Sequence, residues 1–342
     1  MSEVSATGCP TRPAADERRA GSRRVSIAQP LAACPPEPAG EGGVLRPAVR
    51  ADKFMSYDLF FQTQSPWSPV DFNRYFAGRR DFSIRDGQAW YRNEDTGVYF
   101  SFELAEDNEA PRYWAQFNIN YARPRFFILE ALPHVESFVS TFGLAVHDPQ
   151  IDGMGYGPFK SDGFLRGWTA GNRVACSALA GSGHPRPPTM ADDVLKAAWQ
   201  WNAGRRGLQA KVGESVFVPQ IMFVAGPVGP LTAAVWSDAI RVLLPTVDVV
   251  FLYRDAYAPR RLFRRKPDVA VLKWDALEPA LQDYRVESGP VSYRRLDYAS
   301  PPTLISTLFR QAVASVPDDV VAADSILESE LVARIPEWQA SG

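Results

Sequence analysis

Short runs of alternating hydrophobic and polar residues predict an antiparallel sheet in the first half of the chain. The clearest run is 98–104, where Val98, Phe100 and Phe102 share one face of a strand and the residues between them share the other. The Asp86-Gly87 pair follows an earlier short run and is typical of a hairpin turn. Further strands are predicted at 57–63, 82–85, 88–92 and 113–121.

Apolar residues at helical spacing predict helices between and after these strands. Ser68 and Pro69 form an N-cap and first-turn pair, so a helix is expected to begin there. Pro133 is expected to open a second helix, which Gly143 closes. Longer helices are predicted at about 161–180 and 190–212.

The last third of the chain returns to strand patterns. The spacing of four apolar runs predicts an antiparallel meander. These runs are 216–225, 231–236, 240–244 and 247–253. A further strand at 269–273 and helices at 303–315 and 324–334 are expected after them.

Strands grouped apart from helices, without regular alternation of the two, predict an α+β fold with antiparallel sheets and helices packed on one face. A Gly-, Pro- and Ser-rich segment at 181–188 separates the two groups of elements. We therefore expect an N-terminal sheet-and-helix region at 55–182. A helix, the meander and the C-terminal helices are expected at 189–342.

The composition changes sharply before Met55. Alanine, proline and glycine make up 22 of the first 54 residues, and the only aromatic residue there is Phe54. Such a segment buries too little apolar surface to offset its ordering entropy, so residues 1–54 are expected to be a disordered tail. Because Met55 is followed directly by a strand, a native start at Met55 is a second interpretation.

Charge and cysteine content narrow the classes of function. The chain has 37 basic and 39 acidic residues, a net charge of −2, so it has no overall field that attracts nucleic acid or an anionic membrane. Cys9, Cys34 and Cys176 do not form a disulfide framework, and the histidines lack metal-binding spacing. No apolar run is long enough to span a bilayer. We expect a cytoplasmic protein without cofactor, metal or membrane contact.

A glycine-rich segment before the helix at 161–180 is the first candidate ligand site. Gly155 and Gly157 precede Lys160 and Ser161, an order that resembles a phosphate-binding loop. Phe159 stands where such a loop requires glycine, so a nucleotide site is disfavoured. A loop that binds another ligand and a plain loop with Ser161 as the helix cap remain the two interpretations.

One face of the same helix is the second candidate. Trp168 and Asn172 are four residues apart, and so are Gly167 and Gly171, whose small size would let another backbone approach closely. Core packing and an aromatic ligand-binding ledge are both consistent with this pattern. Candidate acid–base carboxylates are Asp95, Glu103 and Glu130, without a spacing that pairs them.

The third candidate is one dense basic run. It consists of Arg260, Arg261, Arg264, Arg265 and Lys266, with an interleaved aromatic residue. Such a run suits phosphate contacts, but residues 55–342 carry a net charge of −4. A solvated loop or a contact with an acidic protein is therefore favoured over nucleic acid.

Four motifs carry a resemblance to a known group of proteins. They are Tyr57–Phe61 (YDLFF), Thr96–Phe102 (TGVYFSF), Asn120–Pro124 (NYARP) and Gly163–Asn172 (GFLRGWTAGN). The chain from Met55 resembles an uncharacterised family of bacterial proteins, similar in size and style to immunity proteins that neutralise toxins. The resemblance implies no catalytic residue.

These patterns together favour a soluble bacterial binding protein with a protein partner, of the immunity type. An enzyme acting on a phosphorylated or sugar-like ligand near Gly153–Ser161 is the first alternative. Nucleic-acid binding through Arg260–Lys266 is the second. No catalytic residue and no metal ligand are predicted.

Overall fold

The alternating runs of the first half form one antiparallel sheet of seven strands, in the order β2-β3-β4-β5-β1-β6-β7. The computed structural model describes residues 55–339 except 66, 106–112, 262–263 and 266, so the expected disordered tail lies outside the described residues. The strands are β1 (Ser56–Gln62), β2 (Phe82–Arg85), β3 (Gln88–Arg92), β4 (Tyr99–Leu104), β5 (Ala115–Asn120), β6 (Ala145–Asp148) and β7 (Gly155–Gly157).

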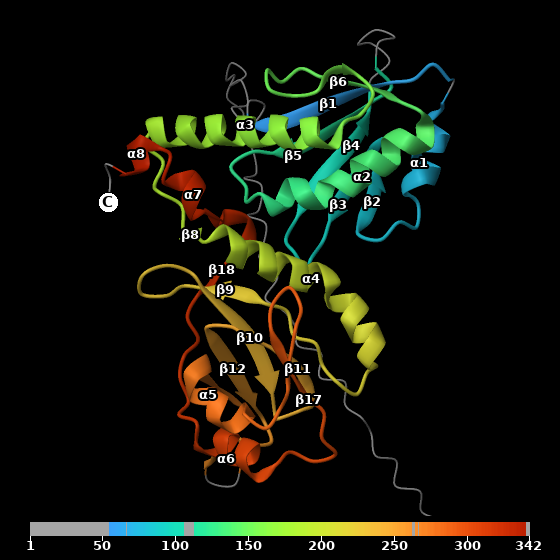
Figure 1. Ribbon diagram of the computed structural model, residues 1–342. Coiled ribbons are helices and arrows are strands. Elements are labelled where there is room, and N and C mark those ends of the chain that lie inside the picture. The colour runs from blue at the N-terminus through green and yellow to red at the C-terminus, as the bar shows by residue number, and fades with distance from the viewer. Residues whose placement is uncertain (1–54, 66, 106–112, 262–263, 266, 340–342) are drawn as a thin grey trace, which may run out of the picture. The chain divides into compact units, whose positions relative to one another are not determined.

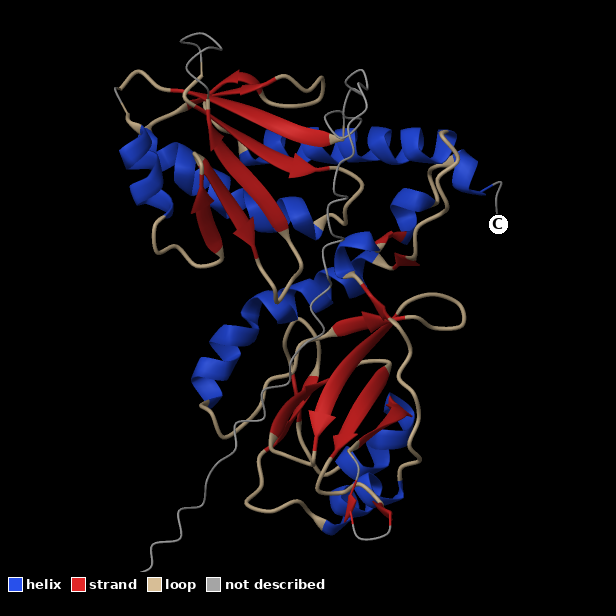
Figure 2. Cartoon of the chain, turned by 180° about the vertical axis from the view of Figure 1, so that it is seen from behind, coloured by secondary structure: helices blue, strands red, loops and turns tan. Residues whose placement is uncertain are grey.

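Strict alternation gives this sheet one buried face. In β1, Tyr57, Leu59 and Phe61 are fully buried, while the residues between them are partly exposed. The helices α1 (Pro69–Phe76), α2 (Phe126–Phe142) and α3 (Ser161–Gly181) all lie on the buried side of the sheet, as Figures 1 and 2 show from opposite directions. The expected α+β fold, with helices on one face of an antiparallel sheet, is confirmed.

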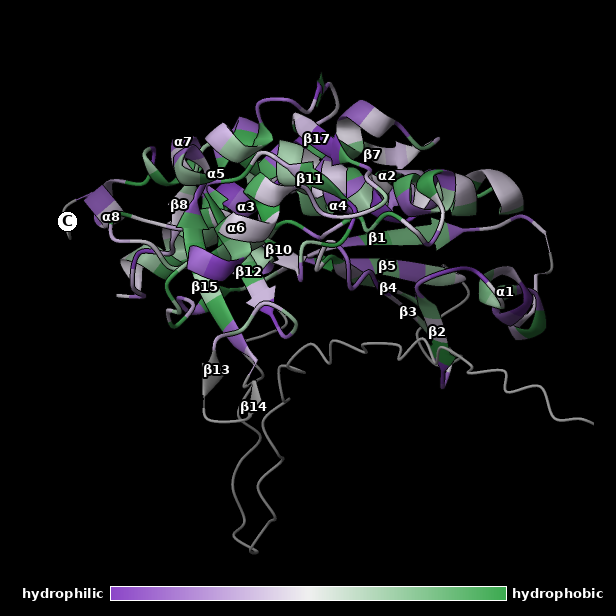
Figure 3. Ribbon diagram, turned by 90° about the horizontal axis from the view of Figure 1, so that it is seen from below, coloured by the Kyte–Doolittle hydropathy of each residue, from purple (hydrophilic) through white to green (hydrophobic). Residues whose placement is uncertain are grey.

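Helix α1 begins where its sequence signals predict. Ser68 and Asp71 form a capping box, in which each side chain bonds the backbone N–H of the other residue, and Pro69 is the first helical residue. Phe72 and Phe76 are buried on one side of the helix. Both hydrophobic and hydrophilic positions are visible along α1 in Figure 3.

The predicted start of α2 at Pro133 is wrong. The helix begins seven residues earlier, at Phe126, and Pro133 lies in its interior. A proline inside a helix removes one backbone hydrogen bond. The earlier turns bury Phe126, Phe127 and Ile128 almost completely, and this apolar burial outweighs the loss. The predicted end at Gly143 is correct, because Gly143 is a left-handed C-cap.

Helix α3 packs closely because of its glycines. A Cβ atom at Gly167 would lie 2.9 Å from the Cα atom of Gly153, so the predicted close approach of another backbone is confirmed there. At Gly171 the neighbour is instead the Tyr121 side chain, which occupies the space that a Cβ would need.

The two larger sheets of the second half have the orders β15-β12-β10-β9-β18 and β11-β17-β16. The strands are β9 (Met222–Val224), β10 (Leu231–Ser237), β11 (Val242–Pro245), β12 (Val249–Arg254), β15 (Asp268–Lys273), β16 (Val286–Glu287), β17 (Tyr293–Leu296) and β18 (Val320–Val321). The helices are α4 (Asp192–Val212), α5 (Trp274–Leu281) and α6 (Thr303–Gln311).

The predicted antiparallel meander is wrong. Strands β10 and β12 pair in parallel, because β11 leaves their sheet and pairs with β17. All four residues of β11 are buried, so this strand lies in the hydrophobic core although β10 and β12, its neighbours in sequence, belong to another sheet. Its partner is about fifty residues away along the chain, and local spacing carries no information about that pairing.

Two other segments differ from their predicted structure. Of 216–225 only β9 is a named strand, and Phe217 forms an isolated bridge to Val242. The expected helix at 324–334 is replaced by η2 (Ala323–Ser325), β19 (Leu327–Glu328) and α7 (Ser329–Val332), before α8 (Pro336–Gln339). Strand β19 pairs in parallel with β8 (Thr189–Met190), and this long-range pairing takes the backbone out of helical geometry.

The hydrophobic interior consists mainly of two clusters. One is built from buried residues between Tyr57 and Ala175, the other from buried residues between Met190 and Ile326. Helix α4 contributes to both, because Trp199 packs on the first cluster and Trp201 belongs to the second. All described residues fall in one compact unit, so the expected division into two regions remains a prediction.

Candidate functional site

The seven-stranded sheet has a second face that no described helix covers (Figure 2). We call it the open face. One row of register partners crosses all seven strands on this face, so its side chains lie side by side. The row is Arg85, Gln88, Glu103, Gln116, Phe60, His147 and Tyr156.

A chain of side-chain hydrogen bonds fixes the exposed tryptophan on this face. Trp90 is 45% exposed, and its Nε1 donates to Gln88 Oε1 at 2.9 Å. Gln88 Nε2 in turn donates to Glu103 Oε1 at 2.8 Å, and Gln116 Nε2 donates to Glu103 Oε2 at 2.9 Å. The indole ring and the Glu103 carboxylate are therefore held in place before any partner binds.

A second carboxylate lies in the neighbouring row. Asp58 accepts hydrogen bonds from Asn118 Nδ2 at 2.6 Å and from Ser56 Oγ at 3.0 Å. Only neutral groups donate to Asp58 and Glu103, and neither forms a salt bridge with a described cation. The centre of the open face therefore holds two carboxyl groups without a described cationic partner.

Aromatic rings complete the face on the β6–β7 side. Tyr113 and His147 stack with centroids 5.6 Å apart, and the Tyr113 hydroxyl bonds His147 Nδ1 at 2.6 Å. The Phe60 ring lies 5.1 Å from that of Tyr113. Tyr156 is 67% exposed, with its hydroxyl bonded to Gln62 Oε1. The open face thus combines fixed aromatic rings with fixed carboxylates and carboxamides.

Among these residues, only Glu103 was a candidate functional residue on the basis of the sequence. The alternating pattern shows that one side of each strand is polar, but it does not show which strands are neighbours. An aromatic residue at a polar-side position, as at Trp90 and Tyr156, was the local signal that could have pointed to this face.

The glycine-rich segment is not a free phosphate-binding loop. Gly155 and Gly157 belong to the edge strand β7, which pairs with β6. The preceding turn encloses the chain's own Asp148 carboxylate, to which the backbone N–H groups of Gln150 and Met154 donate at 3.0 and 2.9 Å. The anion that this loop binds is therefore part of the protein.

The predicted cap at Ser161 is also wrong. Lys160 is the N-cap residue of α3, without a side-chain hydrogen bond to the helix, and Ser161 is the first helical residue. Lys160 is exposed and Ser161 half-buried. Neither residue lines the cavity next to Trp168, so the structure does not bring the predicted loop and ledge together.

Trp168 and Asn172 lie at the edge of a cavity of about 600 Å³. Both are buried, and their polar atoms are used within the fold. Trp168 Nε1 donates to the Asn120 carbonyl at 3.3 Å. Asn172 Oδ1 accepts from the N–H of Ala122 at 2.6 Å, and its Nδ2 donates to the Arg123 carbonyl at 3.0 Å. Their ligand-binding role remains a prediction.

The candidate carboxylate Glu130 is the centre of a buried network. Its Oε1 accepts from the Tyr91 hydroxyl at 2.8 Å, Asn93 Nδ2 at 2.8 Å and the Thr96 hydroxyl at 3.0 Å. Its Oε2 accepts from Trp199 Nε1 of α4 at 2.6 Å. Four neutral donors satisfy this 7% exposed carboxylate, so it is held firmly without a counter-ion.

Other charged groups surround this network at a cavity of about 340 Å³. Asp95 forms salt bridges with both Arg205 and Arg206, and Arg206 also pairs with Asp81. Burial lowers the pKa of His134, in the same cavity, to about 4. Because the carboxylates and arginines bond one another, we interpret the group as the polar attachment of α4 to the N-terminal sheet.

The predicted basic run is described only in part. Arg260–Arg261 and Arg264–Arg265 form the two short strands β13 and β14, which pair with each other. Lys266 and all five side chains lie outside the described residues. A role in binding nucleic acid therefore remains a prediction.

The described part of the chain contains no group of three or more His, Cys, Asp or Glu residues placed to hold a metal ion. No helix within it combines the length and hydrophobicity that crossing a bilayer requires. Cys176 is a buried free thiol whose pKa burial raises to about 12, and the other two cysteines lie outside the described residues.

No protein-family model, curated protein or solved structure matches this chain. The resemblance carried by its four motifs remains a prediction.

Proposed function

We propose that this protein binds another protein through the open face, and that the partner presents a basic surface. The observation that carries the proposal is the hydrogen-bonded chain from Trp90 through Gln88 to Glu103 on a sheet face without a described helix. Tryptophan is one of the residue types most enriched at the energetic centres of protein interfaces, and Trp90 is exposed. Because its ring is already fixed, binding costs less conformational entropy.

The charge of the face supports a basic partner. Asp58 and Glu103 have no described cationic partner, so arginine or lysine side chains of a partner would gain attraction there. Each oxygen of these two carboxyl groups accepts one hydrogen bond from a described side chain and can accept another. If the partner is a protein toxin, as in the immunity interpretation, a toxin with a basic surface would fit this face.

A photo-crosslinking residue placed at position 90 tests the proposal in the native host. Val174 is a matched control position, because it is exposed on α3, away from the open face. The captured protein is then purified and its affinity measured by calorimetry. The proposal requires capture at position 90 and not at position 174.

Substitutions then test the chemistry. We expect Trp90→Ala to weaken binding by about 30-fold, the loss typical of a central aromatic contact. Glu103→Lys should weaken it further and reduce its salt dependence. Tyr253→Ala, an exposed aromatic on another sheet, is the control. Unchanged affinity with Trp90→Ala would refute the use of this face.

Growth assays separate the immunity role from other protein binding. The captured partner should arrest growth when expressed alone, and co-expression of the wild-type chain should restore growth. Trp90→Ala should fail to restore it. A harmless partner would leave protein binding in place and reject the immunity role.

A further inference from the structure

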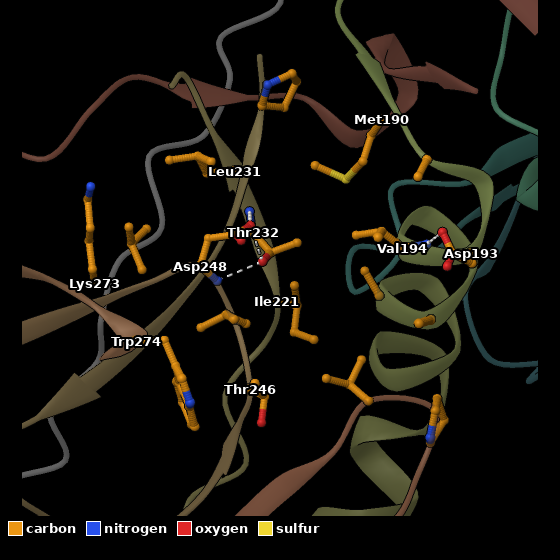
Figure 4. Close-up of a pocket in the computed structure, with 18 of the residues that line it drawn as sticks. Met190, Asp193, Val194, Ile221, Leu231, Thr232, Thr246, Asp248, Lys273 and Trp274 are labelled. Carbon is orange, nitrogen blue, oxygen red and sulfur yellow. Dashed lines mark hydrogen bonds between the residues drawn. The ribbon is translucent and has the colours of Figure 1, made fainter. Parts of the chain in front are cut away.

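A cavity of about 910 Å³ lies beside the first half of α4. Figure 4 shows Met190 and Val194 on one side of it, and Lys273 and Trp274 on the other. Apolar side chains form most of its walls, and the volume is in the range of pockets that hold small molecules. No residue of the open face lines it, so it is a separate site.

One carboxylate is fixed in the wall of this cavity. Asp248 Oδ2 accepts from both the backbone N–H and the hydroxyl of Thr232, each at 2.7 Å. In return the Asp248 N–H donates to the Thr232 hydroxyl at 2.9 Å (Figure 4). Asp248 Oδ1 has no hydrogen-bond partner among the described residues. The pair therefore holds an acceptor in place and leaves it available to a ligand.

An aromatic ring accompanies this carboxylate. The backbone N–H of Trp274 donates to the Asp248 carbonyl at 3.0 Å, which fixes the two residues beside each other, and both line the cavity. In Figure 4 the Trp274 ring extends away from Asp248, so the carboxylate can attract a charged group while the ring contacts the apolar part of the same ligand.

The charges around the cavity also favour a cation. Three aspartates, Asp193, Asp248 and Asp275, line it together with a single basic residue, Lys273. Lys273 pairs in register with Val249, and its ammonium group makes no hydrogen bond or salt bridge with a described residue. In Figure 4 its ammonium group points away from Asp248. The lysine therefore reduces the negative field without neutralising Asp248.

We propose that this cavity binds a small organic cation, an amine or guanidinium group attached to an apolar body. Asp248 receives the charged group, and Trp274, Met190 and Val194 contact the apolar body. This site is independent of the proposed protein interface.

Three indole compounds of similar shape provide the test on the full chain. Tryptamine carries an ammonium group, tryptophol is neutral, and indole-3-propionate is an anion. The methyl signal of Met190, followed by NMR with labelled methionine, reports binding in the cavity. We expect saturable binding of tryptamine, weaker binding of tryptophol and the weakest of indole-3-propionate.

Two substitutions should have opposite effects on tryptamine. Asp248→Asn should weaken its binding by about fivefold, and Lys273→Met should strengthen it by a few fold, because the first removes an attractive charge and the second a repulsive one. Asp283→Asn, an exposed aspartate outside the cavity, should change nothing. Thermal melting confirms that each variant is folded.

Several outcomes would overturn the proposal. They are tighter binding of indole-3-propionate, no binding of tryptamine at millimolar concentration, or an unchanged affinity in folded Asp248→Asn. If Asp248→Asn does not fold, Lys273→Met decides, and an equal or lower affinity for tryptamine rejects the site.

Discussion

His134 should make the folded protein sensitive to mild acid. It lies on α2 one turn after Glu130, and its ring centroid is 4.6 Å from that of Tyr91 and 5.6 Å from that of Phe100. Burial among these rings, with a smaller contribution from Arg79, lowers its pKa from 6.5 to about 4, against an opposing effect of Asp81. The ring is therefore neutral in the folded protein at neutral pH.

The direction of the effect follows from this shift. Below pH 6.5 the unfolded chain takes up a proton at His134 that the folded protein does not, so stability falls as the pH decreases towards 4. At about 1.4 kcal/mol per pKa unit, the loss is about 2 kcal/mol at pH 5 and about 3 kcal/mol at pH 4. Because the ring is half-buried, these values are upper limits.

Urea unfolding of the wild type and of His134→Gln at pH 7 and pH 5 measures this loss. Carboxyl groups also titrate in this range, so the quantity to compare is the difference in unfolding free energy between the two proteins. We expect that difference to change by about 2 kcal/mol in favour of the variant between the two pH values.

His184→Gln is the matched control, because His184 is exposed and its ring bonds only the neighbouring Ser182. The unfolding free energy of His184→Gln should change between pH 7 and pH 5 by the same amount as that of the wild type. The burial argument would be refuted if the difference in unfolding free energy between the wild type and His134→Gln changed by less than about 0.5 kcal/mol between pH 7 and pH 5. The denaturant slopes must be unchanged for this comparison.

Two further pairs of substitutions test the packing. Gly171→Ala should lower the unfolding free energy by about 1–3 kcal/mol, because the new methyl group would overlap the Tyr121 hydroxyl, whereas Gly204→Ala in α4 meets nothing and should raise it by up to about 1 kcal/mol. Equal effects in urea unfolding would contradict this. Glu130→Ala leaves four donors without an acceptor and should cost about 3 kcal/mol or more, against about 1 kcal/mol for Trp199→Phe, which removes one. Similar melting points for the two variants would show that the network contributes little.

The α+β class, five of the seven strands of the N-terminal sheet and the start of α1 could be predicted from the sequence. These features depend on interactions within a few residues: the alternation of Val98, Phe100 and Phe102, or the capping of Pro69 by Ser68. The close packing of Gly167 could also be inferred, because two glycines one helical turn apart leave room for a backbone.

The pairings between distant segments were decided only by tertiary structure. Strand β11 joins β17 and leaves β10 and β12 parallel, and Leu327–Glu328 extends beside β8 where its local pattern predicts a helix. The burial of Phe126 and Phe127 similarly outweighs the helix-breaking tendency of Pro133.

The candidate sites depended on tertiary structure for the same reason. A row of residues from seven strands forms the open face, and the cavity at Asp248 joins α4 to strand ends that follow it by dozens of residues. Local patterns determine which side of a strand or helix is apolar. The free energy of packing and of long-range hydrogen bonds determines which of these sides meet, and therefore where a ligand or partner could bind.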